Sequence, residues 1–130
     1  MRKINLILTA SLLPLLIAGC ATTSTSITNL TPQVESRNAN GLYPVEAELN
    51  TRQQSLRWET IQPSVLVGTE SFPMRPTPLM TNRWETLIPM PPGQNSVIYR
   101  IRFDYAVNTF GPPKAESTVS KPFRLQVTEQ

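Results

Sequence analysis

The chain has 130 residues, with twelve lysines and arginines, nine aspartates and glutamates, one cysteine and no histidine. Without histidine a chain lacks the commonest general base and metal ligand, and it cannot form a Ser-His-Asp triad. Beyond Arg2 and Lys3 its basic residues stand singly, which argues against a nucleic-acid-binding surface. We therefore expect a protein that is not an enzyme, holds no metal or soluble cofactor and does not bind nucleic acid.

The first part of the chain has the features of an export signal. Residues 1–19 begin with basic side chains, continue with a mainly apolar stretch over 4–17, and end with two small residues before Cys20. The apolar stretch is broken by Pro14. It is also shorter than the roughly 20 residues that a membrane-spanning helix needs. We expect residues 1–19 to be cleaved from the mature protein.

The residues at the expected cleavage site are Leu16, Ile17, Ala18, Gly19 and Cys20. They resemble the lipobox of bacterial lipoproteins, which is an aliphatic residue, two small residues and a cysteine. Ile17 replaces the commoner leucine, although Leu16 stands beside it. The resemblance implies cleavage before Cys20 and covalent lipid on its thiol, which would anchor the protein in the cell membrane or envelope. An ordinary secretory signal with a chance cysteine is the alternative.

The mature chain after cleavage would have 111 residues, which is the length of a single domain, with ten basic and nine acidic side chains. Ala21 follows the cysteine. In Gram-negative lipoproteins an aspartate there resembles an inner-membrane retention signal, so alanine favours the outer membrane if the host is Gram-negative. Residues 20–26 are predicted to be the lipidated cysteine and a flexible tether, and residues 27–130 one domain.

The rest of the chain alternates apolar and polar residues with the period of two that is typical of half-buried strands. The clearest strand covers 97–107, in which every second residue is apolar. Residues 35–41, 72–80 and 108–117 are predicted as loops or irregular crossings. The other residues predicted to point inward are Tyr43, Val45, Ala47 and Leu49, then Leu56, Trp58 and Thr60, then Trp84, Thr86 and Ile88, and finally Phe123, Leu125 and Val127.

About seven short strands without a helical period predict an all-β fold, a single antiparallel β-sandwich. Residues 99–108 and 120–127 resemble the last two strands of an immunoglobulin-like or fibronectin-III-like domain. Trp58 lies on the third expected strand, where such domains often bury a tryptophan. The cysteine pair of true immunoglobulins is absent, so the resemblance implies the architecture only.

A short motif, Arg-Trp-Glu-Thr, begins at Arg57 and again at Arg83. Two copies are too few for a stacked repeat protein. The favoured interpretation is two comparable strands that each bury a tryptophan, with Arg and Glu on the opposite face. The alternative is that one tryptophan is exposed and stacks on a sugar or a partner.

Binding residues concentrate in loops that a rigid scaffold holds in place. The loops 74–80 and 108–117 are the longest and the least explained by packing. We therefore predict a contact surface there, formed by Met74, Arg75, Leu79, Met80, Phe110 and Lys114.

The function predicted from these features is that of a non-enzymatic, lipid-anchored envelope protein. Its domain would contact other envelope proteins in a surface assembly, in adhesion or as a scaffold. The alternative is binding of a carbohydrate or peptidoglycan through exposed aromatic side chains.

Replacing the lipid-bearing cysteine tests the anchor. Because the thiol is the acylation site in the family that this signal resembles, Cys20→Ser should leave the precursor uncut and mislocalised. Intact-mass analysis of the wild-type protein should show acyl chains on an N-terminal Cys20. A mature protein that begins elsewhere, or has an unmodified Cys20, would contradict the lipobox interpretation.

Overall fold

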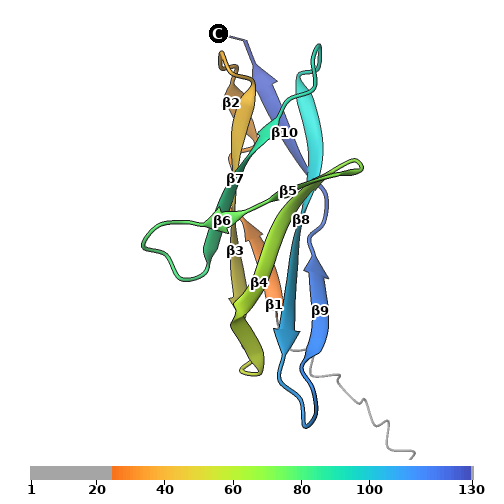
Figure 1. The fold of residues 1–130 in the computed structure, drawn as a ribbon. Coiled ribbons are helices and arrows are strands. Elements are labelled where there is room, and N and C mark those ends of the chain that lie inside the picture. Colours follow the sequence, from red (N-terminus) through yellow and green to blue (C-terminus); the bar gives the residue numbers. More distant parts are fainter. Residues whose placement is uncertain (1–24, 130) are drawn as a thin grey trace, which may run out of the picture.

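The computed structural model describes residues 25–129, which form ten strands and no helix. The predicted signal segment 1–19, Cys20 and residues 21–24 of the predicted tether lie outside the described residues. The strands form two sheets that pack face to face as an elongated sandwich (Figure 1). The prediction of an all-β sandwich is confirmed.

One sheet has four strands, and all its neighbours are antiparallel. Its order across the sheet is β1-β3-β7-β6. The bounds are β1 (Thr25–Asn29), β3 (Leu42–Thr51), β7 (Arg83–Pro89) and β6 (Arg75–Pro76).

The other sheet has the order β2-β10-β8-β4-β5, and β9 pairs with the part of β8 that β10 does not reach. The pairing of β2 with β10 is parallel and the others are antiparallel. The bounds are β2 (Val34–Ser36), β10 (Phe123–Thr128), β8 (Ser96–Val107), β4 (Leu56–Val67), β5 (Glu70–Pro73) and β9 (Lys114–Val119).

The strand orders match those of an immunoglobulin-like sandwich. The order β1-β3-β7-β6 corresponds to strands A-B-E-D of that fold, and β4-β8-β9 corresponds to C-F-G. Ten strands replace the seven or so expected, because the segments at the sheet edges split into short pieces. The central antiparallel pairs of the two sheets are β3·β7 and β4·β8.

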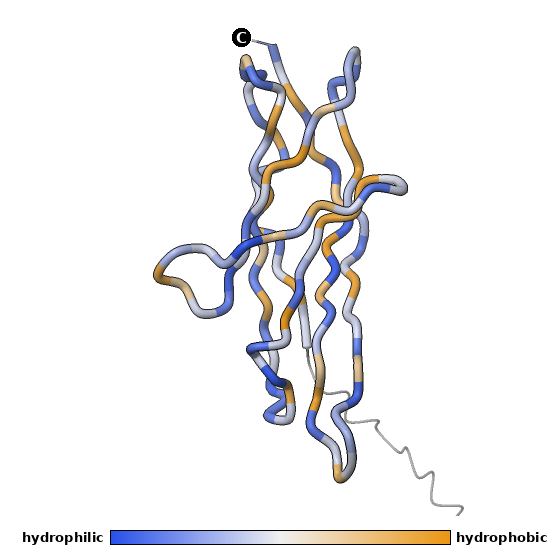
Figure 2. Tube along the Cα trace, viewed as in Figure 1, coloured by the Kyte–Doolittle hydropathy of each residue, from blue (hydrophilic) through white to orange (hydrophobic). Residues whose placement is uncertain are grey.

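The core lies between the sheets, and its apolar residues alternate along the strands (Figure 2). Strand β8 provides the longest buried row, and the prediction for it is confirmed at all six positions: Val97, Tyr99, Ile101, Phe103, Tyr105 and Val107. The four inward residues predicted for β3 are also buried: Tyr43, Val45, Ala47 and Leu49. Because each row comes from a different sheet, their contact closes the sandwich.

Three segments differ from the sequence predictions. Residues 114–119 form strand β9 rather than the end of a loop, and residues 34–36 form β2. Thr25 and Ser26 belong to β1 rather than to the tether. These segments are short and mostly polar, so their sequences show no clear alternation of apolar residues. Backbone pairing with β8, β10 and β3 holds them in the sheets instead.

The prediction that Trp58 is buried is wrong, because β4 carries a large bulge. Arg57 pairs with Ala106 and the next paired residue, Gln62, faces Asp104, so four residues of β4 lie opposite one residue of β8. The three extra residues reverse the inward and outward alternation. Trp58 is therefore 45% exposed, whereas Pro63 and Val65 beyond the bulge are buried.

The Thr60 hydroxyl stabilises this bulge. It donates to the backbone oxygen of Arg57 at 2.6 Å and accepts from the backbone N–H of Ala106 at 2.9 Å. The side chain thus replaces ladder bonds that the extra residues interrupt. Ile61, which strict alternation with Leu56, Trp58 and Thr60 would turn to the outer face, packs partly against the core for the same reason.

The central strand offers a matched pair of neighbours. Phe103→Ala should lower the free energy of unfolding by about 3–5 kcal/mol, because its fully buried ring fills the core. Arg102→Ala should cost only about 0.5 kcal/mol, because this side chain forms a half-exposed ion pair with Asp104. Urea unfolding measures both. Equal losses would mean that the faces of β8 are assigned wrongly.

Candidate contact surface

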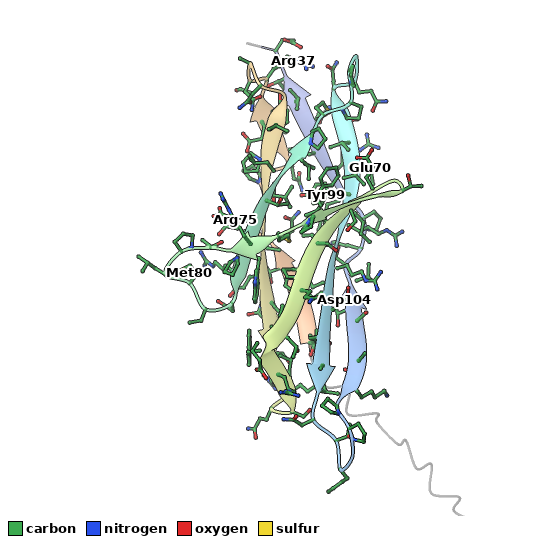
Figure 3. The ribbon with its side chains drawn as sticks, viewed as in Figure 1. Arg37, Glu70, Arg75, Met80, Tyr99 and Asp104 are labelled. Atoms are coloured by element: carbon green, nitrogen blue, oxygen red, sulfur yellow. The ribbon has the colours of Figure 1, made fainter. Side chains whose placement is uncertain are left out.

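The six residues predicted as a contact surface lie in two separate places. Met74 is only 8% exposed and belongs to the core. Arg75 belongs to β6 at the edge of the four-stranded sheet, and Met80 lies in the β6–β7 loop that leaves the body of the sandwich (Figure 3). Leu79 precedes Met80 in the same loop. Phe110 lies in the β8–β9 loop at one end of the sandwich, and Lys114 is the first residue of β9. The two loops do not form one surface.

The β6–β7 loop holds an apolar side chain in solvent. Leu79 is 103% exposed and has a φ of 65°, the left-handed region that β-carbon sterics disfavour. The backbone N–H of Met80 donates to the Thr77 oxygen at 3.2 Å, which closes a turn with Pro78 and Leu79 at its centre. Glycine or asparagine is preferred at the position that Leu79 occupies. The loop therefore presents Leu79 at a cost in backbone strain.

The base of this loop also carries polar groups without partners. Within the described residues, Thr77 Oγ1 and Arg83 Nε are buried and have no hydrogen-bond partner. The two residues face each other, since the Thr77 N–H donates to the Arg83 backbone oxygen at 2.9 Å. Unsatisfied buried polar atoms and strained backbone are uncommon in a merely structural loop.

A groove runs beside the loop, between the β5–β6 segment and the outer side of β7. We call it the edge groove. Its lining is mainly apolar and is formed by Pro44, Pro73, Met74, Arg75, Glu85, Thr86 and Leu87. Met74, predicted as a surface residue, is part of the floor, and Leu87 on the rim is 49% exposed. Arg75 and Glu85 place opposite charges on the two walls, with Arg75 Nε 4.0 Å from Glu85 Oε1.

The edge groove ends on a strand edge that is only partly covered. Strand β6 pairs with β7 only at Arg75↔Glu85 and Pro76↔Trp84. The backbone groups of successive residues of β7 point alternately toward β6 and toward β3. The Arg83 oxygen points toward the β6 side, where it accepts from Thr77, and the Met90 N–H points toward the β3 side, where it donates to Gly41. The backbone groups of Glu85 and Leu87 therefore point toward the β6 side. Leu87 therefore offers its N–H and C=O beyond the end of β6. Pro89 then ends the edge, since it has no N–H.

Trp58 provides a second exposed feature on the β4 bulge. Arg57 Nε donates to Glu59 Oε1 at 3.0 Å beside it. The pKa of the Glu59 carboxyl lies below its ordinary value, because the carboxylate accepts a hydrogen bond from its own backbone and another from Arg57. Trp84 and all three tyrosines are buried. Trp58 is therefore not part of a row of exposed tryptophan and tyrosine rings.

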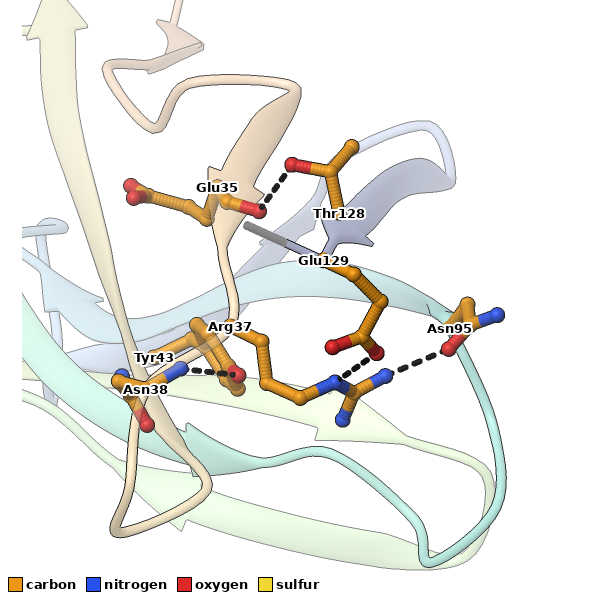
Figure 4. Close-up of polar contacts among 7 residues, drawn as sticks. All are labelled: Glu35, Arg37, Asn38, Tyr43, Asn95, Thr128 and Glu129. Carbon is orange, nitrogen blue, oxygen red and sulfur yellow. Dashed lines mark hydrogen bonds and ion pairs between the residues drawn. The ribbon is translucent and has the colours of Figure 1, made fainter.

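The end of the sandwich that holds the C-terminus is stabilised by a polar cluster (Figure 4). The Arg37 guanidinium contacts the Glu129 carboxylate and donates from Nη2 to Asn95 Oδ1 at 2.5 Å. Nearby, the Asn38 N–H donates to the Tyr43 hydroxyl at 3.1 Å. These bonds join β2, the β7–β8 loop and the end of β10. Because the Arg37 guanidinium already has partners within the domain, we interpret the cluster as structural.

The described residues contain no group of three or more acidic or cysteine side chains placed to hold a metal ion. In the same part of the chain, no helix is long and apolar enough to cross a membrane. Neither the known protein families nor the curated proteins compared with the chain give a match.

Proposed function

We propose that this protein is a lipid-anchored, non-enzymatic envelope protein whose sandwich domain binds another envelope protein. The binding surface consists of the edge groove and the β6–β7 loop. Its occupant is an extended segment of the partner, which adds to the free edge of β7 at Leu87. The anchor rests on the resemblance of residues 16–20 to a lipobox.

The observation that carries this proposal is the exposed, strained Leu79 next to an incompletely paired strand. A bulky apolar residue in the left-handed region lowers stability without any compensating contact inside the domain. Such a residue is explained if a partner covers it. A neighbouring strand edge with free backbone groups and an apolar groove suits an extended peptide, which gains main-chain hydrogen bonds and side-chain burial together.

Two substitutions at positions of similar exposure test the surface. Leu87 is 49% exposed in the edge groove, and Ile98 is 53% exposed on the outer face of the other sheet. Leu87→Arg should reduce co-purification of the partner from detergent-solubilised membranes by about tenfold or more, which corresponds to roughly 1.4 kcal/mol. Ile98→Arg should leave it unchanged. Mass spectrometry of the co-purified proteins gives the measurement.

Leu79→Gly serves as a second variant in the same experiment, because it separates binding from folding. Glycine adopts a positive φ without strain, so this variant should be at least as stable as the wild type. It should nevertheless fail to co-purify the partner, as Leu87→Arg does. Retention of every co-purifying protein by both variants, or an equal loss with Ile98→Arg, would contradict the proposal.

Glycan binding remains a second candidate function, and the exposure of Trp58 is the observation that favours it. An exposed indole ring can stack on a sugar. Glycan-binding surfaces gain from several such rings, whereas the other large aromatic side chains near Trp58 on β8 point into the core. A partner that survives Leu87→Arg but is lost with Trp58→Ala would favour this candidate.

A further inference from the structure

One end of the sandwich gathers the start of β1, the β3–β4 turn and the β8–β9 loop (Figure 1). Thr25 pairs with Thr51, and their hydroxyl oxygens lie 2.8 Å apart. The Asn108 N–H donates to the Ser55 oxygen at 2.7 Å, which joins the β8–β9 loop to the β3–β4 turn. Thr25, Gln53 and Lys114 line the same surface hollow. We call this the β1 end.

A phenylalanine projects from the β1 end. Phe110 is 115% exposed, the highest value among the large apolar residues described. The loop around it is held in shape: the Thr109 hydroxyl donates to the Pro112 oxygen at 2.8 Å and accepts from the Gly111 N–H at 3.1 Å. Two consecutive prolines follow. The ring is thus presented on a stiff support with no contact inside the domain to explain it.

The β3–β4 turn and the β8–β9 loop carry charges of one sign. The segments 50–56 and 108–115 contain Arg52 and Lys114 and no acidic residue. The next carboxylate along β9 is Glu116, which is half-buried and shares the hollow with Lys114. An exposed aromatic ring flanked by cations is the combination that favours the interface of an anionic membrane.

The chain length places this end close to the proposed anchor. Thr25 is five residues after Cys20. Even a fully extended chain of that length spans only about 18 Å. The sandwich is longer, because the 12-residue strand β8 alone rises about 40 Å. A lipid on Cys20 would therefore hold the β1 end near the bilayer while the opposite end could lie well away from it.

We propose that the β1 end of the domain contacts the membrane in which the protein is anchored. The Phe110 ring then lies in the interfacial layer, and Arg52 and Lys114 lie beside the lipid headgroups. This inference rests on the proposed lipid anchor at Cys20. The acyl chains supply the membrane affinity, and Phe110 sets the orientation. The edge groove and the β6–β7 loop, on the side of the sandwich, then stay accessible to a partner.

Tryptophan quenching by lipid tests this orientation in the mature lipidated protein. In a Trp58→Phe background, Phe110→Trp introduces the reporter and Leu79→Trp is the matched control, because both original side chains are fully exposed. Each protein is placed in vesicles of phosphatidylethanolamine and phosphatidylglycerol in which part of the lipid has brominated acyl chains. Trp84 is buried in both proteins and gives a common background. Phe110→Trp should be quenched several-fold more strongly than Leu79→Trp.

The outcomes separate the orientation from the anchor. If the protein is acylated on Cys20 and floats with the vesicles but neither reporter is quenched, the orientation is wrong and the anchor stands. Equal quenching of both reporters also overturns the orientation, since the domain would then lie on its side. If Cys20 is not acylated and the protein does not float, the anchor and the orientation both fail.

Discussion

The contact between Trp84 of β7 and Phe103 of β8 joins the two sheets at the centre of the molecule. Their ring centroids lie 5.3 Å apart at an interplanar angle of 75°, an edge-to-face arrangement that aromatic pairs favour. The contact needs β7 to stay in register with β3 and β8 to keep its strict alternation. Both strands do so, and the remaining core residues pack around this pair.

The irregular features of the molecule lie outside the buried core, and they carry the surfaces that we connect with function. The bulge in β4 exposes Trp58, the short β6 leaves part of β7 uncovered, and the strained turn presents Leu79. None of these three features stabilises the sandwich. The core is regular, whereas the strained and exposed apolar residues lie at the surface. This arrangement is the one expected for a binding module on a rigid scaffold.

The regular part of the fold could be predicted from local patterns, because alternation in β3 and β8 reports directly on burial. The two Arg-Trp-Glu-Thr segments show where this reasoning ends. They share four residues, yet Trp84 is buried and Trp58 is exposed, because β7 keeps its register with β3 whereas Trp58 lies in the bulge of β4. The edge groove could not be predicted from the sequence either, because it depends on how few residues of β6 pair with β7. The proline-rich segment 72–80 gave the only local signal, and it indicated an irregular edge without showing that Met74 belongs to the core.

The most direct test of this account is the solvent accessibility of the two tryptophans in the full chain. Trp58→Phe leaves only Trp84, and Trp84→Phe leaves only Trp58, so acrylamide quenching of each variant reports on one ring. The protein that retains Trp84 should emit at shorter wavelength and be quenched weakly, as its 6% exposure requires. The protein that retains Trp58 should be quenched several-fold more strongly. Equal quenching of the two rings would contradict the bulge in β4 and the contact that joins the sheets.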